Sequence, residues 1–324
     1  MNRTRIPDEV LAAAHARARA REARDWPEAD RLRAEIEAAG WKIVDRGTDF
    51  ALQPAHAPDV HEDGRVRHGA SASVPSRLDE APVGVATVVA VATVFPEDLE
   101  RALAPLREHA PDGTQVVLVA NDPSLDQAVA LEALDAIDPG GPGVATEVVW
   151  TSAPLGHAEA LNAGIRRAAA PVVILLDTSV EPTGDVVSPL VEALDDPTVA
   201  VAGALGIVSD DLRRFRDAPA GDVDAIEGYL LAFRRADYAE RGPLDERFRF
   251  YRNLDIWWSL VLRDAGPDAT GPHRRAVALD LPVRRHEHRG YASLPEAERD
   301  RLSKRNFYRI IDRFGNRHDL LTAR

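Results

Sequence analysis

A continuous apolar run, Val172-Val173-Ile174-Leu175-Leu176, restricts the fold of this chain more than any other feature. Its β-branched and aliphatic residues show no polar alternation, which is typical of a strand buried on both faces of a parallel sheet. Asp177 ends the run, and Ala158, Leu161, Ile165 and Ala168 precede it at helical spacing. A helix that leads into such a strand predicts an open α/β sheet, whose ligands bind at the carboxyl ends of the strands. Asp177 also suits a simple turn, so this segment alone does not establish a site.

The rest of the chain divides into three predicted parts. Residues 1–54 contain two helices, broken at Pro27 and stopped by Gly40, followed by a short hairpin. Residues 55–82 are rich in Pro, Ala, Ser, His and charge without apolar periodicity, and predict a flexible linker. Residues 83–324 alternate strands and helices, which predicts a doubly wound, mostly parallel α/β sheet, and they end in an amphipathic helix near residues 294–314.

Composition excludes several classes of protein. No run approaches the roughly 18 apolar residues of a membrane span, and the first ten residues lack the apolar core of a signal peptide, so we expect no transmembrane segment and a cytoplasmic location. The chain has no Cys, which rules out disulfides and thiolate chemistry. Its net charge of −13 argues against general nucleic-acid binding. Residues 284–324 are an exception, with 11 Lys/Arg against 6 Asp/Glu, and form either a cationic wall for an anionic ligand or a solvated helix.

The N-terminal part has a recognisable pattern. Its centre, AREARDWPEADRLRAEIEAAGWKIVDRGTDFAL, resembles the small C-terminal domain of cysteinyl-tRNA synthetases over about 35 residues. In those enzymes the region helps to contact tRNA, so the resemblance implies RNA or protein docking through residues 1–54. A plain helical-hairpin spacer is the alternative.

Four segments of the larger part occur in one order. These are a strand ending at Thr93, the segment Asn121-Asp122-Pro123-Ser124, the helix GHAEALNAGI with LLDTS, and LDERFRFYRNLDIWWSLVLRDAG. Their order resembles family 2 glycosyltransferases, which have the A-type nucleotide-sugar-binding fold, over about 240 residues. The resemblance implies a nucleoside diphosphate sugar as the donor. It places the nucleotide against Thr93, Asp122, Gly156, Asn162 and Asp177, each of which could instead be a turn or capping residue.

The expected metal site departs from the family pattern. Family members usually have a second Asp where this chain has Ser179, and a hydroxyl is a weaker ligand for Mg²⁺ or Mn²⁺. The resemblance implies a divalent cation held by Asp177, with help from His286 and His288, which share one face if the segment is extended. Surface histidines in a basic loop are the alternative, and Arg or Lys could then neutralise the diphosphate.

The catalytic base is predicted near the end of the resemblance. Family members open a helix here with an acidic pair, and this chain has Leu254-Asp255, so Asp255 is the expected base. A simple N-cap is the alternative role for this Asp. At most one of Trp257 and Trp258 is expected to contact the acceptor.

These residues predict an inverting glycosyltransferase with an unidentified acceptor. The alternative is a non-catalytic nucleotide- or RNA-docking protein built on a degenerate glycosyltransferase sheet, because the second Asp is missing.

Overall fold

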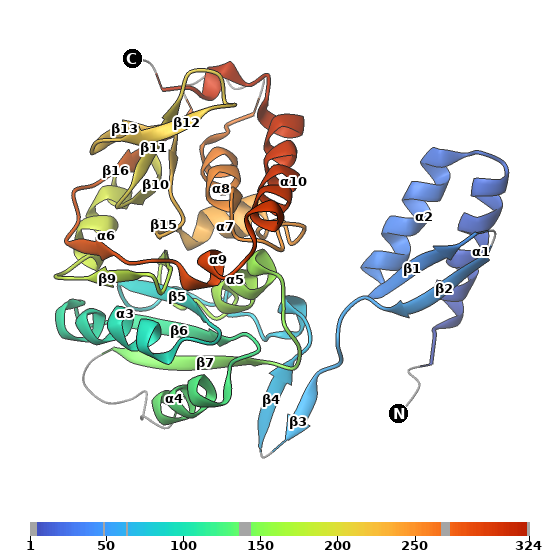
Figure 1. Ribbon diagram of the computed structural model, residues 1–324, viewed down its shortest axis with the longest axis horizontal. Coiled ribbons are helices and arrows are strands. Elements are labelled where there is room, and N and C mark those ends of the chain that lie inside the picture. Colours follow the sequence, from blue (N-terminus) through green and yellow to red (C-terminus); the bar gives the residue numbers. More distant parts are fainter. Residues whose placement is uncertain (1–4, 48, 63, 136–143, 267–272, 323–324) are drawn as a thin grey trace. The chain divides into compact units, whose positions relative to one another are not determined.

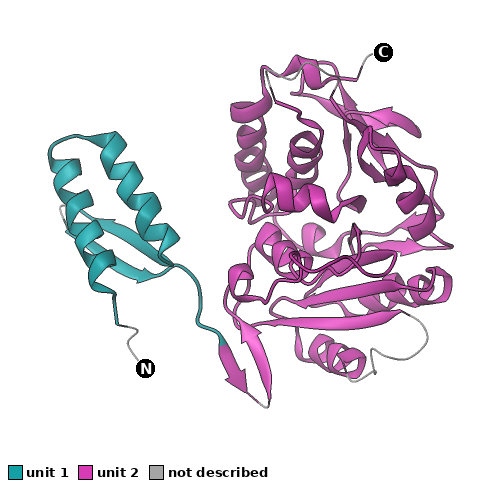
Figure 2. Ribbon diagram, turned by 180° about the vertical axis from the view of Figure 1, so that it is seen from behind, with its two compact units in different colours: residues 1–59 teal, residues 60–324 magenta. Residues whose placement is uncertain are grey.

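The structure is a computed structural model that describes residues 5–47, 49–62, 64–135, 144–266 and 273–322. The chain divides into two compact units, Met1–Asp59 and Val60–Arg324 (Figure 2). Across the described residues, no helix has the length and apolar character needed to cross a membrane.

Unit 1 has the predicted helices and hairpin. Its elements are α1 (Asp8–Glu22), α2 (Trp26–Ala38), β1 (Trp41–Arg46) and β2 (Asp49–Pro54), with β1 and β2 antiparallel. The Asp25 side chain caps α2 by accepting from the Glu28 N–H at 3.2 Å. The unit has its own core, formed by Val10, Ala13, Ala14, Leu32, Ile36, Trp41 and Ile43. Arg17 of α1 forms a 2.8 Å ion pair with Asp45 of β1, which connects the first helix to the hairpin.

The described part of unit 2 is built around a ten-stranded sheet (Figure 1). Its order is β13 (Gly221–Val223), β16 (Arg275–Ala278), β10 (Val199–Gly203), β15 (Leu230–Arg234), β8 (Val172–Leu176), β5 (Ala86–Ala92), β6 (Thr114–Ala120), β7 (Ala145–Thr151), β4 (Arg65–His68) and β3 (Val60–Glu62). The central strands β8, β5, β6 and β7 are parallel, whereas β15 runs antiparallel to both of its neighbours. The predicted doubly wound, mostly parallel sheet is confirmed.

Helices cover both faces of this sheet. One core contains α3 (Pro96–His109), α4 (Leu125–Asp135) and α6 (Val187–Asp195); the other contains α5 (His157–Ile165), α7 (Arg235–Arg241), α8 (Leu254–Arg263) and α10 (Glu296–Phe314). Gly164 lets α5 lie close to the sheet, since a Cβ there would come within 2.5 Å of Val89 Cγ1 and 2.9 Å of Val119 Cγ2. This close packing sets the position of the amino end of α5 over the strand ends.

Smaller elements complete unit 2. Strands β12 (Phe215–Ala218), β11 (Gly206–Ser209) and β14 (Ala225–Ile226) form a three-stranded sheet, and β17 (Val283–Arg285) pairs with β9 (Val180–Pro182). The remaining short helices are η1 (Ser71–Ser73), α9 (Arg289–Ala292) and η2 (His318–Leu320).

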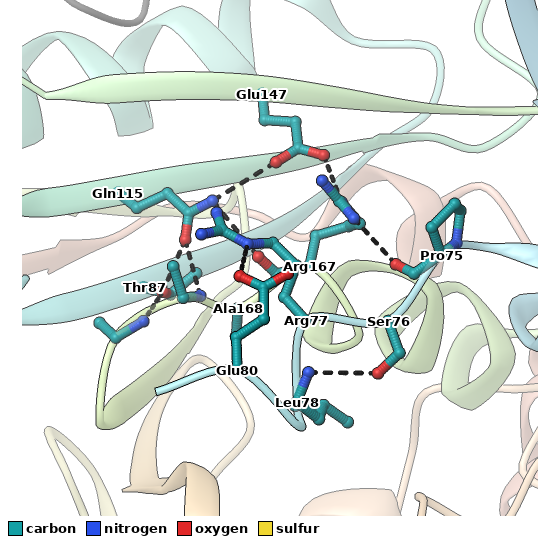
Figure 3. A network of polar contacts seen from close by, with 12 residues as sticks. Pro75, Ser76, Arg77, Leu78, Glu80, Thr87, Gln115, Glu147, Arg167 and Ala168 are labelled. Carbon is teal, nitrogen blue, oxygen red and sulfur yellow. Dashed lines mark hydrogen bonds and ion pairs between the residues drawn. The ribbon is translucent and has the colours of Figure 1, made fainter. Parts of the chain in front are cut away.

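The structure differs from the flexible linker that we expected over residues 55–82. Strand β4 lies within this range and pairs in parallel with β7, so the segment extends the main sheet. Val74, with 1% of its surface exposed, belongs to the core. Pro75, the next residue, contacts a polar network on the sheet (Figure 3). In this network Gln115 accepts from Thr87 at 2.8 Å and donates to Glu147. Arg167 donates to Glu147 and, at 3.0 Å, to the Pro75 carbonyl. Within the segment itself, Arg77 and Glu80 form a 2.9 Å ion pair.

Candidate active site

A cavity of about 620 Å³ lies at the carboxyl ends of the parallel strands. Thr93 and Phe95 follow β5, Asn121 follows β6, and Asp177 follows β8, and all four line it. Much of the remaining lining comes from residues 227–229, Leu231, residues 249–256 and the segment that contains His288. The cavity is therefore where an open α/β sheet is expected to bind its ligand.

Asp177 and His288 form one ionic group in this cavity. Asp177 Oδ1 accepts from the Ser179 N–H at 2.8 Å and from the Ser179 hydroxyl at 2.5 Å, and Oδ2 lies 3.3 Å from His288 Nε2. Burial opposes the charge on the carboxylate, but the bonds from His288 and Ser179 outweigh it and lower the pKa of Asp177. Burial likewise opposes the charge on His288, while Asp177 raises its pKa overall. The His288 ring also stacks on Tyr251, with centroids 4.4 Å apart.

His286 does not join this group. Its Nε2 lies 2.7 Å from Glu181 Oε2, so the two histidines that we expected to act together contact different carboxylates. The chain leaves the extended conformation after β17, and His288 caps α9 by accepting from the Tyr291 N–H at 3.1 Å.

Residues 284–289, which we call the basic strap, lead from β17 into α9, and His288 and Arg289 line the cavity. Every basic side chain of the strap contacts a carboxylate: Arg284 and His286 contact Glu181, Arg285 contacts Glu227, His288 contacts Asp177, and Arg289 contacts Glu97 and Asp98. Because these acids come from different parts of the chain, the ion pairs on both sides of His288 restrain its position.

Three predicted nucleotide contacts, Asp122, Asn162 and Gly156, are not among the residues that line the cavity. Asp122 is exposed, has a φ of 52°, and is not among the residues that line the cavity. The preceding residue, Asn121, lines the cavity, and its side chain bonds to the Leu155 backbone at 2.7 and 3.1 Å. Asn121 was not among the expected nucleotide contacts, although it is the polar residue that directly follows β6. Thr93, another expected nucleotide contact, lines the cavity.

Asn162 is part of the framework. It is 1% exposed, its Oδ1 accepts from Tyr238 Oη at 2.9 Å and the Leu244 N–H at 3.0 Å, and its Nδ2 donates to the Leu244 carbonyl and to Glu246. These four bonds use its full capacity, so no atom of the amide remains for a base. Gly156 is the N-cap residue of α5 and is not among the residues that line the cavity. A Cβ at this position would lie 3.1 Å from Arg249 Cα.

Asp255 lies in the cavity wall in the first turn of α8. Its Oδ2 accepts from the Gly228 N–H at 2.9 Å and its Oδ1 from the Ile256 N–H at 2.9 Å. Burial raises the pKa of Asp255, and these two N–H groups and the charge of Arg252 only partly counter it. A carboxylate with a raised pKa and a fixed orientation is suited to accept a proton.

Two neighbours complete this end of the cavity. Burial raises the pKa of Glu227. The charge of Arg285 partly counters this rise, and the charge of Asp255 adds to it. Trp258 lines the cavity with 2% of its surface exposed, whereas Trp257 packs between Phe248 and Phe314 in the core.

The sequence model of the family described as glycosyl transferase family 2 matches residues 88–254, just over half of the chain. The chain belongs to this family. The matched range begins in β5 and ends at the first residue of α8, so it includes the three strand ends that line one wall of the cavity.

Solved structures with the same fold include other glycosyltransferases. A structure of GalNAc-T7 with UDP, GalNAc and Mn²⁺ is 16% identical to this family 2 chain, with a TM-score of 0.56, and the match covers 74% of this chain and 49% of that one. The mannosyltransferase PcManGT from Pyrobaculum calidifontis, in complex with GDP-Man and Mn²⁺, is 18% identical with a TM-score of 0.53, and the match covers 76% of this chain and 71% of that one. These likenesses confirm the predicted fold.

A different similarity involves the N-terminal part. Over 50 residues, or 15% of its length, the family 2 chain is 48% identical to a cysteine–tRNA ligase from Opitutus terrae. The match spans only 11% of that ligase.

The described residues contain no cluster of three or more His, Asp or Glu side chains that could hold a metal ion by itself. Asp177 and His288 nevertheless present one carboxylate and one imidazole to the cavity, 3.3 Å apart. Mg²⁺ and similar ions are commonly held by one or two carboxylates, with substrate phosphates completing the coordination. The residues of this family 2 chain therefore fit a cation shared with a diphosphate, with two protein ligands rather than three.

Proposed function

We propose that this chain transfers a sugar from a nucleoside diphosphate sugar to an acceptor hydroxyl with inversion at the anomeric carbon. Asp255 is the base of this reaction. The observation that carries the proposal is the position of Asp255: its oriented carboxylate, with a raised pKa, lines the same cavity as the strand-end residues Thr93, Asn121 and Asp177. One cavity thus offers both a nucleotide wall and a proton acceptor.

The chemistry follows from this placement. As the acceptor oxygen attacks the anomeric carbon, Asp255 accepts its proton, and the bond from that carbon to the diphosphate breaks with the electron pair leaving on the phosphate oxygen. A single base opposite the leaving group favours inversion. Asp177 and His288 would hold a divalent cation, which supplies positive charge to the leaving diphosphate. The nucleotides and Mn²⁺ in the two similar solved structures support this choice of donor and ion.

A second candidate is a non-catalytic nucleotide-binding protein. Ser179 stands where the family usually has a second Asp, and its hydroxyl donates to Asp177. That arrangement leaves one carboxylate for the cation, which could support binding without turnover.

We also propose that unit 1 docks RNA or a protein. Its independent core and its similarity to a short part of the ligase support a separate role for this module.

Calorimetry and turnover together test the main proposal. We would measure binding of UDP, GDP and their sugars with and without Mn²⁺, on the intact chain and on Asp177→Ala, and then donor consumption by Asp255→Asn. We expect Mn²⁺-dependent binding that Asp177→Ala weakens. Asp255→Asn should keep nucleotide binding but lower turnover by about 10²–10⁴-fold, the usual contribution of a general base. Nucleotide binding with no donor consumption by the unmodified chain would favour the non-catalytic candidate.

A further inference from the structure

Three arginines line the cavity without an ionic partner. Arg213, Arg249 and Arg252 are exposed lining residues, and among the described residues none of their guanidinium groups forms an ion pair with a carboxylate. Arg289, which also lines the cavity, differs from them because it is bound to Glu97 and Asp98. In a chain with a net charge of −13, three unpaired cations in one cavity point to an anionic ligand.

Two of these arginines belong to the Asp255 end of the cavity. Arg252 precedes Asp255 by three residues, and its charge acts against the raised pKa of both Asp255 and Glu227. Arg213 lies in the connection from β11 to β12. Strand β11 also pairs with β14, which leads directly into Glu227 and Gly228 beside Asp255. Arg213 therefore comes from the small sheet next to the base and not from the strand ends that form the nucleotide wall.

The donor does not account for these cations. In the proposed function, the diphosphate is neutralised by the divalent cation that Asp177 and His288 would hold beside the end of β8. Three lining carboxylates lie at the Asp255 end, and none forms an ion pair with Arg213 or Arg252 among the described contacts. Glu227 is paired with Arg285, Asp255 accepts from two backbone N–H groups, and Asp217 is exposed. Arg252 is further held with its guanidinium carbon 5.9 Å from the centroid of the Tyr291 ring, which restricts where it can reach.

We propose that the acceptor carries a phosphate or carboxylate group close to its reacting hydroxyl, and that Arg252, with Arg213, binds this group. The inference rests on the proposed transferase function and names the substrate class for the acceptor side of that site. A guanidinium group binds phosphate and carboxylate through paired, charge-assisted hydrogen bonds, which also fix the orientation of the ligand. Such a bond would hold the neighbouring hydroxyl against Asp255.

The experiment compares anionic and neutral forms of the same small acceptors. Glycerol, glycerol 3-phosphate and glycerate form one series, and glucose, glucose 6-phosphate and glucuronate form a second. The protein is the full chain saturated with Mn²⁺ and the nucleoside diphosphate that it binds. Binding is measured by calorimetry and transfer by product formation, for the unmodified chain, Arg252→Gln, Arg252→Lys and Arg213→Gln. Arg214→Gln is the matched control, because Arg214 is exposed but does not line the cavity.

We expect at least one anionic compound to bind, and its neutral counterpart to bind at least tenfold more weakly. Arg252→Gln should weaken binding of the anionic compound by about 10- to 100-fold, the range for losing a charge-assisted hydrogen bond. Arg252→Lys should lose less, and Arg214→Gln should change nothing. The phosphate and carboxylate members of each series show which anion the site selects.

Two results would overturn the inference. One is equal binding of neutral and anionic compounds, or no binding of any anion in the two series. The other is an Arg252→Gln variant that loses affinity for the nucleoside diphosphate and keeps its affinity for the anion, which would assign Arg252 to the donor. The binding arm does not require turnover. If anions bind as expected but no donor is consumed, the proposed function fails while the assignment of an anion site stands.

Discussion

Gly228→Ala should impair catalysis through Asp255 alone. The Gly228 N–H donates to Asp255 Oδ2 at 2.9 Å, and a Cβ on residue 228 would lie 3.2 Å from Asp255 Cβ and 3.6 Å from Oδ2. The first of these distances is shorter than an ordinary carbon–carbon contact, so the Asp255 side chain must move by a few tenths of an ångström. That movement misaligns the hydrogen bond that orients the carboxylate.

The size of the effect follows from this one bond. Hydrogen bonds to charged groups contribute about 1.5–3 kcal/mol. If the shift removes roughly half of the upper value, kcat falls about tenfold, because about 1.4 kcal/mol corresponds to a factor of ten in rate. The hydrogen bond from this N–H also stabilises the charged form of Asp255, so weakening it should raise the pKa of Asp255 further. The acidic limb of the pH profile of kcat should therefore move to higher pH.

A double-mutant cycle checks this reasoning. Turnover of the donor is measured from pH 4 to 9 for the unmodified chain, Gly228→Ala, Asp255→Asn and the double variant. Since Gly228 is expected to act only through the Asp255 carboxylate, adding Gly228→Ala to Asp255→Asn should cause little further loss. An equal tenfold loss in both backgrounds, or an unmoved acidic limb, would refute the role given to Gly228.

Three further predictions concern other described contacts. Asn162→Ala should lower the free energy of unfolding by at least about 2 kcal/mol in denaturant titrations, because buried partners lose their hydrogen bonds, while nucleotide affinity measured on the folded fraction stays the same. His288→Ala should weaken Mn²⁺-dependent nucleotide binding in calorimetry, whereas His286→Ala, which loses only its contact with Glu181, should not. The bonds from Arg17 hold the pKa of Asp45 at about 2, below its value in the unfolded chain. The stabilisation that they give is therefore complete above about pH 4 and is lost as the pH falls toward 2. Asp45→Asn should flatten this loss of stability in acid unfolding followed by circular dichroism.

The sequence predicted the sheet well because its signals are local. A run such as 172–176 is apolar on both faces, which is typical of a strand in a sheet covered on both sides. For the same reason Asp177, at the end of the run, is found in the cavity, as predicted from the rule for strand ends. Asp255 was predicted instead from the resemblance to family 2 glycosyltransferases, which open this helix with an acidic pair, and it lines the cavity.

Longer-range contacts could not be predicted in this way. The hydrogen-bonding groups of the Asn162 amide are all occupied by partners at residues 238, 244 and 246, about 80 positions further along the chain. Asp122 is displaced by the left-handed conformation of its own backbone, which nothing in its residue type requires. The alternation that placed His286 and His288 on one face applies only within a strand, and β17 ends at Arg285.

The parallel pairing of β4 with β7 also bears on how the two units came to share one chain. The boundary between units falls at Asp59–Val60, and every strand of the main sheet lies on its C-terminal side. Gene fusion at that point would add or remove the small module without cutting a sheet hydrogen bond. A junction at residue 83, where the matched family pattern nearly begins, would instead strip β4 from β7 and leave that strand as an open edge prone to intermolecular pairing. The compact unit that contains the family 2 pattern therefore begins at Val60, before the first residue that the family pattern matches.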